Sequence, residues 1–230
     1  MAEYKNIVIK IEEKIYTPFT LDEKQDLLGK AYKIFLSRSG KIDNKNIILT
    51  PDHVKELMVK LARLSLDDVV LDTCMGTGGM LTVAQDRLLT LAKGRGKEVA
   101  IHLFGQEINP ETYAICTADM LLKGDGEEAK HIMYGSTLSD DQHASRQFDF
   151  MLSNPPYGKS WKTDAEKMGG KKEILDTRFN TYIEGGEALS MIPRVSDGQL
   201  LFLLNNVAKM NKDTLLRFWR RVSADSRTRY

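Results

Sequence analysis

The chain has 230 residues and a formal net charge of +1 at pH 7, from 33 basic and 32 acidic side chains. That length allows one main domain with a hydrophobic core, and the balanced charge disfavours tight binding to nucleic acid by this chain alone, because such binding relies on clustered Lys and Arg. The two cysteines, Cys74 and Cys116, lack a pair spacing and the four histidines are scattered, so we expect reduced thiols and no metal site.

The segment before Leu49 is predicted to be a short helical module, residues 1–48. Between Leu21 and Phe35, apolar residues recur near helical spacing. The opening residues carry charges throughout, unlike a signal peptide, and no stretch approaches the roughly 20 apolar residues of a transmembrane helix. We therefore expect a cytoplasmic protein.

From Pro51 onward, the sequence alternates between helical and strand patterns. Helices are predicted over 52–64, 80–91, 110–122 and 199–210, and strands over 69–74, 99–104, 131–134 and 148–153. This alternation is typical of a doubly wound α/β fold with a mostly parallel sheet. Ligands of such sheets bind at the carboxyl ends of the strands. Asp72, Glu107 and Asn154 all fall at such ends, which predicts a site there.

A glycine-rich loop, Gly76 to Gly79, follows the first strand and precedes a helix. Glycines permit a tight turn and the close approach of a ligand, and the helix N-terminus supplies free N–H groups. Glu107, at the end of the next strand, can accept hydrogen bonds from both hydroxyls of a ribose. The glycine spacing differs from G-x-G-x-x-G and Glu107 lies beyond the roughly 20-residue interval expected, which disfavours NAD. The alternative is a purely conformational turn.

The tetrapeptide Asn154, Pro155, Pro156, Tyr157 follows an apolar run that is typical of a strand. The prolines stiffen the turn and remove backbone donors, which leaves carbonyl oxygens available. The amino group of a flipped base could donate to the Asn154 side-chain oxygen and to the Pro155 carbonyl oxygen while Tyr157 stacks on the base. Such hydrogen bonds would localise the nitrogen lone pair for attack on a sulfonium methyl. An Asn-Pro loop that only ends a strand is the alternative.

Taken together, these segments resemble the S-adenosylmethionine-dependent N6-adenine DNA methyltransferases, and more narrowly the modification subunit of type I restriction-modification systems. The resemblance runs from about Asp26 to about Asn211 and rests on LDTCMGTGGML (71–81), GQEINPETYAICTADMLLKG (105–124) and FDFMLSNPPYGKSWK (148–162). It implies a Rossmann-like fold and transfer of a methyl group from S-adenosylmethionine to N6 of a flipped adenine.

The resemblance also implies roles for individual residues. The implied cofactor-binding residues are Thr50, Pro51, Asp72, Cys74, Gly76, Thr77, Gly78, Gly79, Glu107 and Ile108. Of these, Asp72 would accept from the cofactor ammonium group, Glu107 would bind the ribose and Ile108 would contact the adenine. The implied catalytic residues are Asn154, Pro155, Pro156 and Tyr157. The run Gly135, Ser136, Thr137, Leu138 aligns with a place where many relatives carry a carboxylate or amide that reads the cofactor's adenine amino group, and this chain departs from that pattern.

In type I systems a specificity subunit reads the DNA sequence and two modification subunits clamp around the DNA. The resemblance therefore implies DNA, a specificity subunit, a restriction subunit and a second copy of this chain as partners. Two alternatives stay open. One is an N-methyltransferase for protein glutamine or RNA guanine, because those amino groups are also planar. The other is an inactive, truncated fragment that binds S-adenosylmethionine weakly.

Two later segments have competing interpretations. Residues 158–186 carry lysines and almost as many acids, so we expect a solvated, mobile loop, with a substrate loop in which Trp161 stacks on the base as the alternative. We assign residues 49–212 to the methyltransferase domain and 213–230 to a basic tail. Beyond Leu216 the resemblance stops, which suggests a C-terminal truncation or frameshift, or else an arginine tail that binds nucleic acid.

Overall fold

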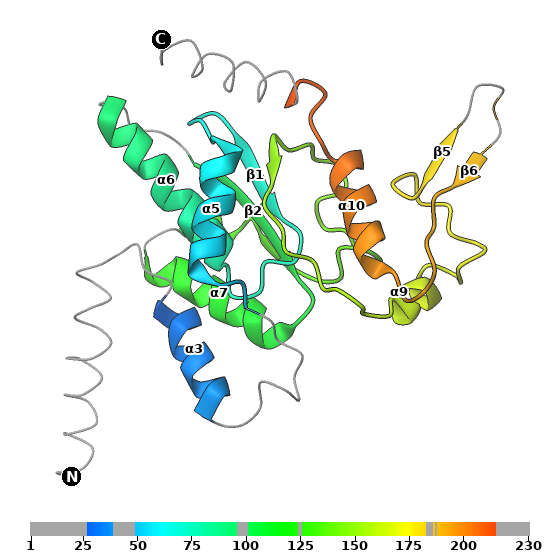
Figure 1. The fold of residues 1–230 in the computed structure, drawn as a ribbon, viewed down its shortest axis with the longest axis horizontal. Helices are drawn as coiled ribbons and strands as arrows, with labels where there is room; N and C mark the ends of the chain where they lie inside the picture. The colour runs from blue at the N-terminus through cyan, green and yellow to red at the C-terminus, as the bar shows by residue number, and fades with distance from the viewer. Residues whose placement is uncertain are drawn as a thin grey trace.

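The computed structural model describes residues 27–38, 49–95, 101–123, 126–182, 186 and 188–214 (Figure 1). The strands are β1 (Val69–Asp72), β2 (His102–Glu107), β3 (Ile132–Tyr134), β4 (Phe150–Met151), β5 (Asn180–Tyr182) and β6 (Ala188–Ser190). The helices are α3 (Leu27–Arg38), α5 (Asp52–Ala62), α6 (Gly79–Arg95), α7 (Pro110–Leu122), α8 (Gly126–Ala129), α9 (Lys162–Lys167) and α10 (Gly198–Ala208).

Four strands form one sheet in the order β3-β2-β1-β4, and each of their pairings is parallel. Val70 and Leu71 of β1 are fully buried, as expected of a central strand covered on both faces. The chain passes from β1 to β2 to β3 in one direction and then returns to place β4 on the other side of β1. The prediction of a doubly wound parallel sheet is confirmed. The reversal between β1 and β4 marks the place where such sheets bind ligands.

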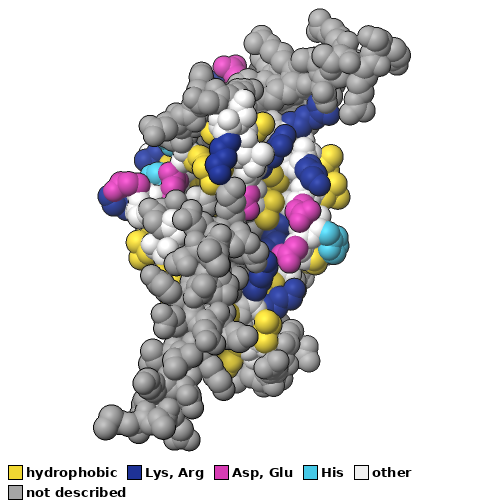
Figure 2. All heavy atoms as spheres, turned by 90° about the vertical axis from the view of Figure 1, so that its left-hand side faces the viewer, with side chains coloured by type: hydrophobic (Ala, Val, Ile, Leu, Met, Phe, Trp, Pro, Cys, Tyr) yellow, Lys and Arg dark blue, Asp and Glu magenta, His cyan; other side chains and the backbone are white. Residues whose placement is uncertain are grey.

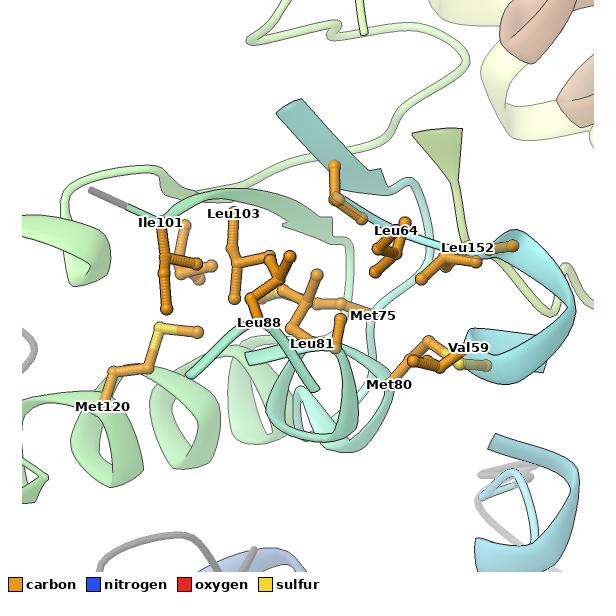
Figure 3. Packing of buried hydrophobic residues seen from close by; sticks show 14 of the residues in the cluster. Val59, Leu64, Met75, Met80, Leu81, Leu88, Ile101, Leu103, Met120 and Leu152 are labelled. Carbon is orange, nitrogen blue, oxygen red and sulfur yellow. The ribbon is translucent and has the colours of Figure 1, made fainter. Parts of the chain in front are cut away.

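The main hydrophobic core lies between the sheet and helices α5, α6 and α7 (Figure 3). Leu81 and Leu88 of α6 pack against Leu103 of β2 in this core. Gly105 allows the chain after β1 to approach β2, because a Cβ at this position would collide with the Met75 sulfur. Met75 N–H also donates to the Gln106 carbonyl oxygen over 3.2 Å. The core therefore sets the path of the glycine loop against β2.

A second hydrophobic core lies around α9 and α10, on the opposite side of the strands from α5 and α6 (Figure 1). Trp161 is 2% exposed, packs with Phe179 and Leu201, and donates from its indole nitrogen to the Arg194 carbonyl oxygen over 2.9 Å. The prediction of a solvated, mobile loop over 158–186 is therefore wrong for its described part. Trp161 also lines the larger of the two cavities described below, so its alternative role as a stacking surface stays a prediction.

Arg178 ties the second core to the loop that follows β3. Its guanidinium donates to the carbonyl oxygens of Thr137 at 2.7 Å and Leu138 at 2.9 Å, and to Asn205 Oδ1 at 2.8 Å. It also forms an ion pair with Asp141 at 3.1 Å. These contacts fix the loop after β3 against α10. Arg178 thus has a structural role that neither interpretation of this segment predicted.

Several element boundaries differ from the predicted ones. The helix over 110–122 has the predicted bounds, α6 is longer than predicted, and β4 is shorter than the strand predicted over 148–153. The β5–β6 hairpin was not predicted. Most of the predicted N-terminal module and the predicted tail beyond residue 214 lie outside the described residues, so the division into domains stays a prediction. Within the described part of the chain, no helix has the length and apolar character needed to span a membrane.

Candidate functional site

Two adjoining cavities lie at the carboxyl ends of the strands. The larger, of about 390 Å³, extends from Glu107 to Tyr157 and has the size of a small-molecule site. The smaller, of about 280 Å³, lies between α3 and the glycine loop. Both are lined by Cys74, Gly76 and Asn154. The two cavities therefore meet at the switch point between β1 and β4.

Most of the predicted site residues line one or both cavities. Those at the larger cavity are Cys74, Gly76, Glu107, Ile108, Asn154, Pro155, Pro156 and Tyr157. Those at the smaller cavity are Thr50, Asp72, Cys74, Gly76, Thr77, Gly79 and Asn154. Pro51 and Gly78 line neither. The fold thus brings together segments that are 104 positions apart, as the hydrogen bond between Asn154 and Thr50 illustrates.

Pro51 and Gly78 have structural explanations. The Pro51 carbonyl oxygen accepts from the N–H groups of Val54 and Lys55 and so begins α5. Gly78 has φ +82°, and a Cβ there would collide with the Cys116 sulfur. Only glycine adopts this conformation without strain. Both residues shape the surroundings of the site without facing its cavities.

Glu107 holds the glycine loop in place from the end of β2. Its Oε2 accepts from the Gly76 N–H at 2.8 Å and its Oε1 accepts from the Asn109 N–H at 2.8 Å. Each carboxylate oxygen keeps a further lone pair. Asn109 in turn caps α7 by accepting from the Glu111 N–H. Glu107 can therefore accept hydrogen bonds from a ligand while it positions both walls of the larger cavity.

Asp72 is a buried carboxyl at the end of β1, and the Cys74 N–H donates to its Oδ1 over 3.1 Å. Burial raises the pKa of Asp72 to about 7, the Cys74 N–H opposes that rise, and the nearby Glu107 carboxylate adds to it. Burial likewise raises the pKa of the Cys74 thiol well above its ordinary value. The thiol is thus neutral at physiological pH, and a cationic ligand group beside Asp72 would favour the ionised carboxylate.

Asn154 lies directly beside the glycine loop. The Ser153 hydroxyl oxygen accepts from the Thr73 N–H at 3.0 Å and from the Thr73 hydroxyl at 2.9 Å, which joins the ends of β1 and β4. The Asn154 Nδ2 donates to Thr50 Oγ1 at 3.1 Å. Because the amide nitrogen faces Thr50, the side-chain oxygen of Asn154 points away from Thr50 and is available to accept a hydrogen bond. Tyr157 is 72% exposed, so its ring is accessible for stacking.

Sequence reasoning singled out the loop around Ser136 but missed Asp164, which completes a polar wall of the larger cavity. Ser136, in the loop after β3, is buried, and its hydroxyl donates to Asp164 Oδ1 in α9 at 2.6 Å. Both residues line the larger cavity. No motif identifies Asp164, because α9 is short and highly charged and was not predicted. The smaller cavity likewise gains lysines that were not predicted, Lys30 and Lys33 from α3 and Lys55 from α5.

Comparison with known proteins places this site in a family. The family model for N-6 DNA methylases matches residues 23–213. The chain belongs to the N-6 DNA methylase family. The resemblance to N6-adenine DNA methyltransferases is therefore confirmed, and the match includes both cavities and the Asn154 to Tyr157 motif.

Two known proteins illustrate what the chain is similar to. The type II restriction enzyme and methyltransferase RM.BcgI of Heyndrickxia coagulans is 27% identical over 93% of this chain and 36% of its own length. The type I restriction enzyme HindI methylase subunit of Haemophilus influenzae is 30% identical over 60% of this chain and 30% of its own length. The chain thus spans about a third of the length of each of these relatives.

Solved structures agree with the fold. The methyltransferase subunit of a type I restriction-modification system from Streptococcus thermophilus superposes with a TM-score of 0.53 at 26% identity, over 73% of this chain and 32% of that subunit. The type I restriction enzyme EcoKI M protein superposes with a TM-score of 0.51 at 20% identity, over 70% of this chain and 31% of that protein. The Rossmann-like methyltransferase fold predicted from the sequence is therefore confirmed.

Proposed function

We propose that this chain carries the catalytic domain of an N6-adenine DNA methyltransferase, and that it acts as the modification subunit of a type I restriction-modification system. The observation that carries the proposal is the position of Asn154. Its side-chain oxygen is an available acceptor at the junction of two cavities, beside a glycine loop and two buried carboxyls. Membership of the N-6 DNA methylase family supports the same chemistry.

The residues of the two cavities fit S-adenosylmethionine. Asp72 would accept from its ammonium group, and burial makes Asp72 a strong partner for a cation. Glu107 would accept from the ribose hydroxyls, and Ile108, which is 57% exposed, would contact the adenine. The bound cofactor supplies a methyl group on a sulfonium. We assign residues 49–212 to the domain that holds it.

Asn154 and its neighbours would position the substrate amino group. Asn154 Oδ1 and the Pro155 carbonyl oxygen would hold the two N–H protons of a flipped adenine, one of which leaves to solvent after the transfer. Tyr157 would stack on the base, at about 1 to 3 kcal/mol, and so offset part of the cost of flipping. The hydrogen bond to Thr50 keeps the Asn154 amide in the orientation that this role requires.

Partners would supply the recognition of DNA. On the face of the described part shown in Figure 2, basic and acidic side chains lie among one another. The whole chain is also nearly neutral, with a formal net charge of +1, so counterion release adds little and a separate specificity subunit would have to direct binding to DNA. A second copy of this chain and a restriction subunit would complete the assembly.

Protein glutamine and RNA guanine are the alternative substrates, because each carries a planar amino group that fits the Asn154 to Tyr157 motif. Family membership favours DNA adenine over both. The decisive assay offers labelled S-adenosylmethionine and DNA free of adenine methylation to the chain with a specificity subunit, and offers release factor and ribosomal RNA in parallel. Label on DNA adenine alone is the expected result. Label on protein or RNA instead would contradict the proposal.

The role of Asn154 is tested by Asn154→Ala in the same assay. Removing one preorganised polar group from a reacting centre costs on the order of a hundredfold in turnover. Binding of S-adenosylmethionine, measured by calorimetry, should be retained. Asn206→Ala in α10 is the matched control, because Asn206 lines neither cavity. Equal turnover by Asn154→Ala and the parent would refute the assigned role, and no cofactor binding by the parent would favour an inactive fragment.

A further inference from the structure

A serine and a carboxylate from different parts of the chain form one wall of the larger cavity. Ser136 follows β3, and Asp164 lies in the first turn of α9. The hydroxyls of Ser136 and Ser139 both donate to Asp164 Oδ1 at 2.6 Å. These short, charge-assisted hydrogen bonds fix both hydroxyl protons toward the carboxylate. Neither proton is then available to a ligand in the cavity.

The wall that results accepts hydrogen bonds and donates none. With its proton committed to Asp164, the Ser136 oxygen offers two lone pairs, of which the Leu138 N–H takes one at 3.3 Å. Asp164 Oδ2 receives no hydrogen bond from the part of the chain that the structure describes. A carboxylate at this place also carries a negative charge. The wall therefore favours a ligand group that donates and disfavours one that presents an oxygen.

The wall lies close to the end of the cavity assigned to the ribose. β3 pairs with β2 so that Tyr134 lies opposite Glu107, and the Gly135 N–H donates to the Glu107 carbonyl oxygen at 3.0 Å. Ser136 is the next residue. A nucleoside whose ribose lies on the Glu107 carboxylate therefore has its base near Ser136 and Asp164.

We propose that Asp164 is a specificity-determining residue of the cofactor site. Together with Ser136 it selects a purine that carries an amino group at position 6 over one that carries an oxygen there. The amino group donates to the wall, whereas the oxygen of a 6-oxo purine faces lone pairs and a negative charge. The inference rests on the proposed function, because it places S-adenosylmethionine in the larger cavity.

A purely structural role for Asp164 predicts something different. If its contacts with Ser136 and Ser139 only hold α9 against the loop after β3, loss of the carboxylate weakens all ligands alike. The ratio of affinities for two ligands that differ only at position 6 of the purine therefore separates the two roles.

The test is calorimetric titration of the full chain with S-adenosylhomocysteine and with S-inosylhomocysteine, its 6-oxo counterpart. The parent should bind the amino compound on the order of a hundredfold more tightly, because a 6-oxo group leaves polar groups of the site unpaired. Asp164→Asn introduces a donor and should reduce that ratio at least about tenfold. Ser136→Ala, which deletes the acceptor oxygen, should also reduce it. Thr163→Ala is the matched control, since Thr163 is exposed on the same helix as Asp164 and does not line the cavity, and should keep the parent ratio.

The outcomes distinguish this inference from the proposed function. A ratio that Asp164→Asn and Ser136→Ala both leave unchanged would overturn the role of Asp164 and leave the cofactor site standing. No binding of either compound by the parent would overturn both. If the protein prefers the amino compound to the 6-oxo compound in a way that depends on Asp164 but methylates no DNA, this inference would be supported and the proposed function contradicted.

Discussion

Replacement of Asp72 by asparagine should stabilise the protein and abolish cofactor binding. Asp72 is 3% exposed, and burial raises the pKa of its carboxyl from 3.8 to about 7. Because this pKa is higher in the folded than in the unfolded state, the parent loses stability as the pH rises from about 4 to about 7 and loses no more above that. A rise of about three in pKa corresponds to about 4 kcal/mol in the free energy of unfolding.

Urea unfolding of the parent and Asp72→Asn at pH 5 and pH 8 measures this effect. Asparagine keeps an oxygen for the Cys74 N–H but carries no charge to bury. The variant should be more stable by about 4 kcal/mol at pH 8 and by about 1 to 2 kcal/mol at pH 5, where the folded parent is already protonated. Comparing the two proteins at one pH cancels the titration of all other groups. Asp67→Asn, at an exposed position before β1, is the matched control and should change stability little at either pH.

Two results would refute this reasoning. One is a stability difference that is the same at both pH values, and the other is a variant that is less stable than the parent at pH 8. S-adenosylmethionine should raise the melting temperature of the parent, because a ligand that binds only the folded state stabilises it. S-adenosylmethionine should leave the melting temperature of Asp72→Asn unchanged, since the ligand's ammonium group has lost its carboxylate acceptor.

Three further predictions concern the site and its supports. Calorimetry at varied pH should show that the affinity for S-adenosylmethionine rises as Asp72 ionises near pH 7. The affinity should fall again above about pH 8, where the ligand amino group loses its proton. An affinity independent of pH would contradict this prediction. Gly78→Ala should lower the free energy of unfolding by about 2 to 4 kcal/mol, because the positive φ of this residue and the nearby Cys116 sulfur both oppose a Cβ. Gly94→Ala in α6 is the matched control: its added methyl group meets open space, and the variant should be more stable than the parent by up to about 1 kcal/mol. Trp161→Ala should cost about 3 to 5 kcal/mol in thermal unfolding; unchanged stability would show that the ring does not pack in the second core.

The sequence predicted best where local signals and burial agree. The helix over 110–122 has its predicted bounds because Asn109 caps it and Pro110 occupies its first turn. β1 was evident as an apolar, β-branched run before glycines, as is typical of a buried parallel strand. Since consecutive strands end at one edge of the sheet, the proximity of Asp72, Glu107 and Asn154 also followed from the pattern.

The remaining features depend on contacts between distant residues. Trp161 stands among lysines in the sequence, and its burial depends on Phe179 and Leu201, which no local pattern connects to it. Asp164 meets Ser136 across 28 positions through a helix of six residues, too short for a periodic signal. Such contacts are set by packing of the whole domain, so a reading of local periodicity cannot supply them.

A crystal structure of the chain with S-adenosylhomocysteine tests the central claim most directly. The account predicts the ligand ammonium group on Asp72, the ribose hydroxyls on Glu107, and the sulfur facing the Asn154 side-chain oxygen across a space that a base can enter. A ligand bound elsewhere, or one whose sulfur points away from Asn154, would contradict it.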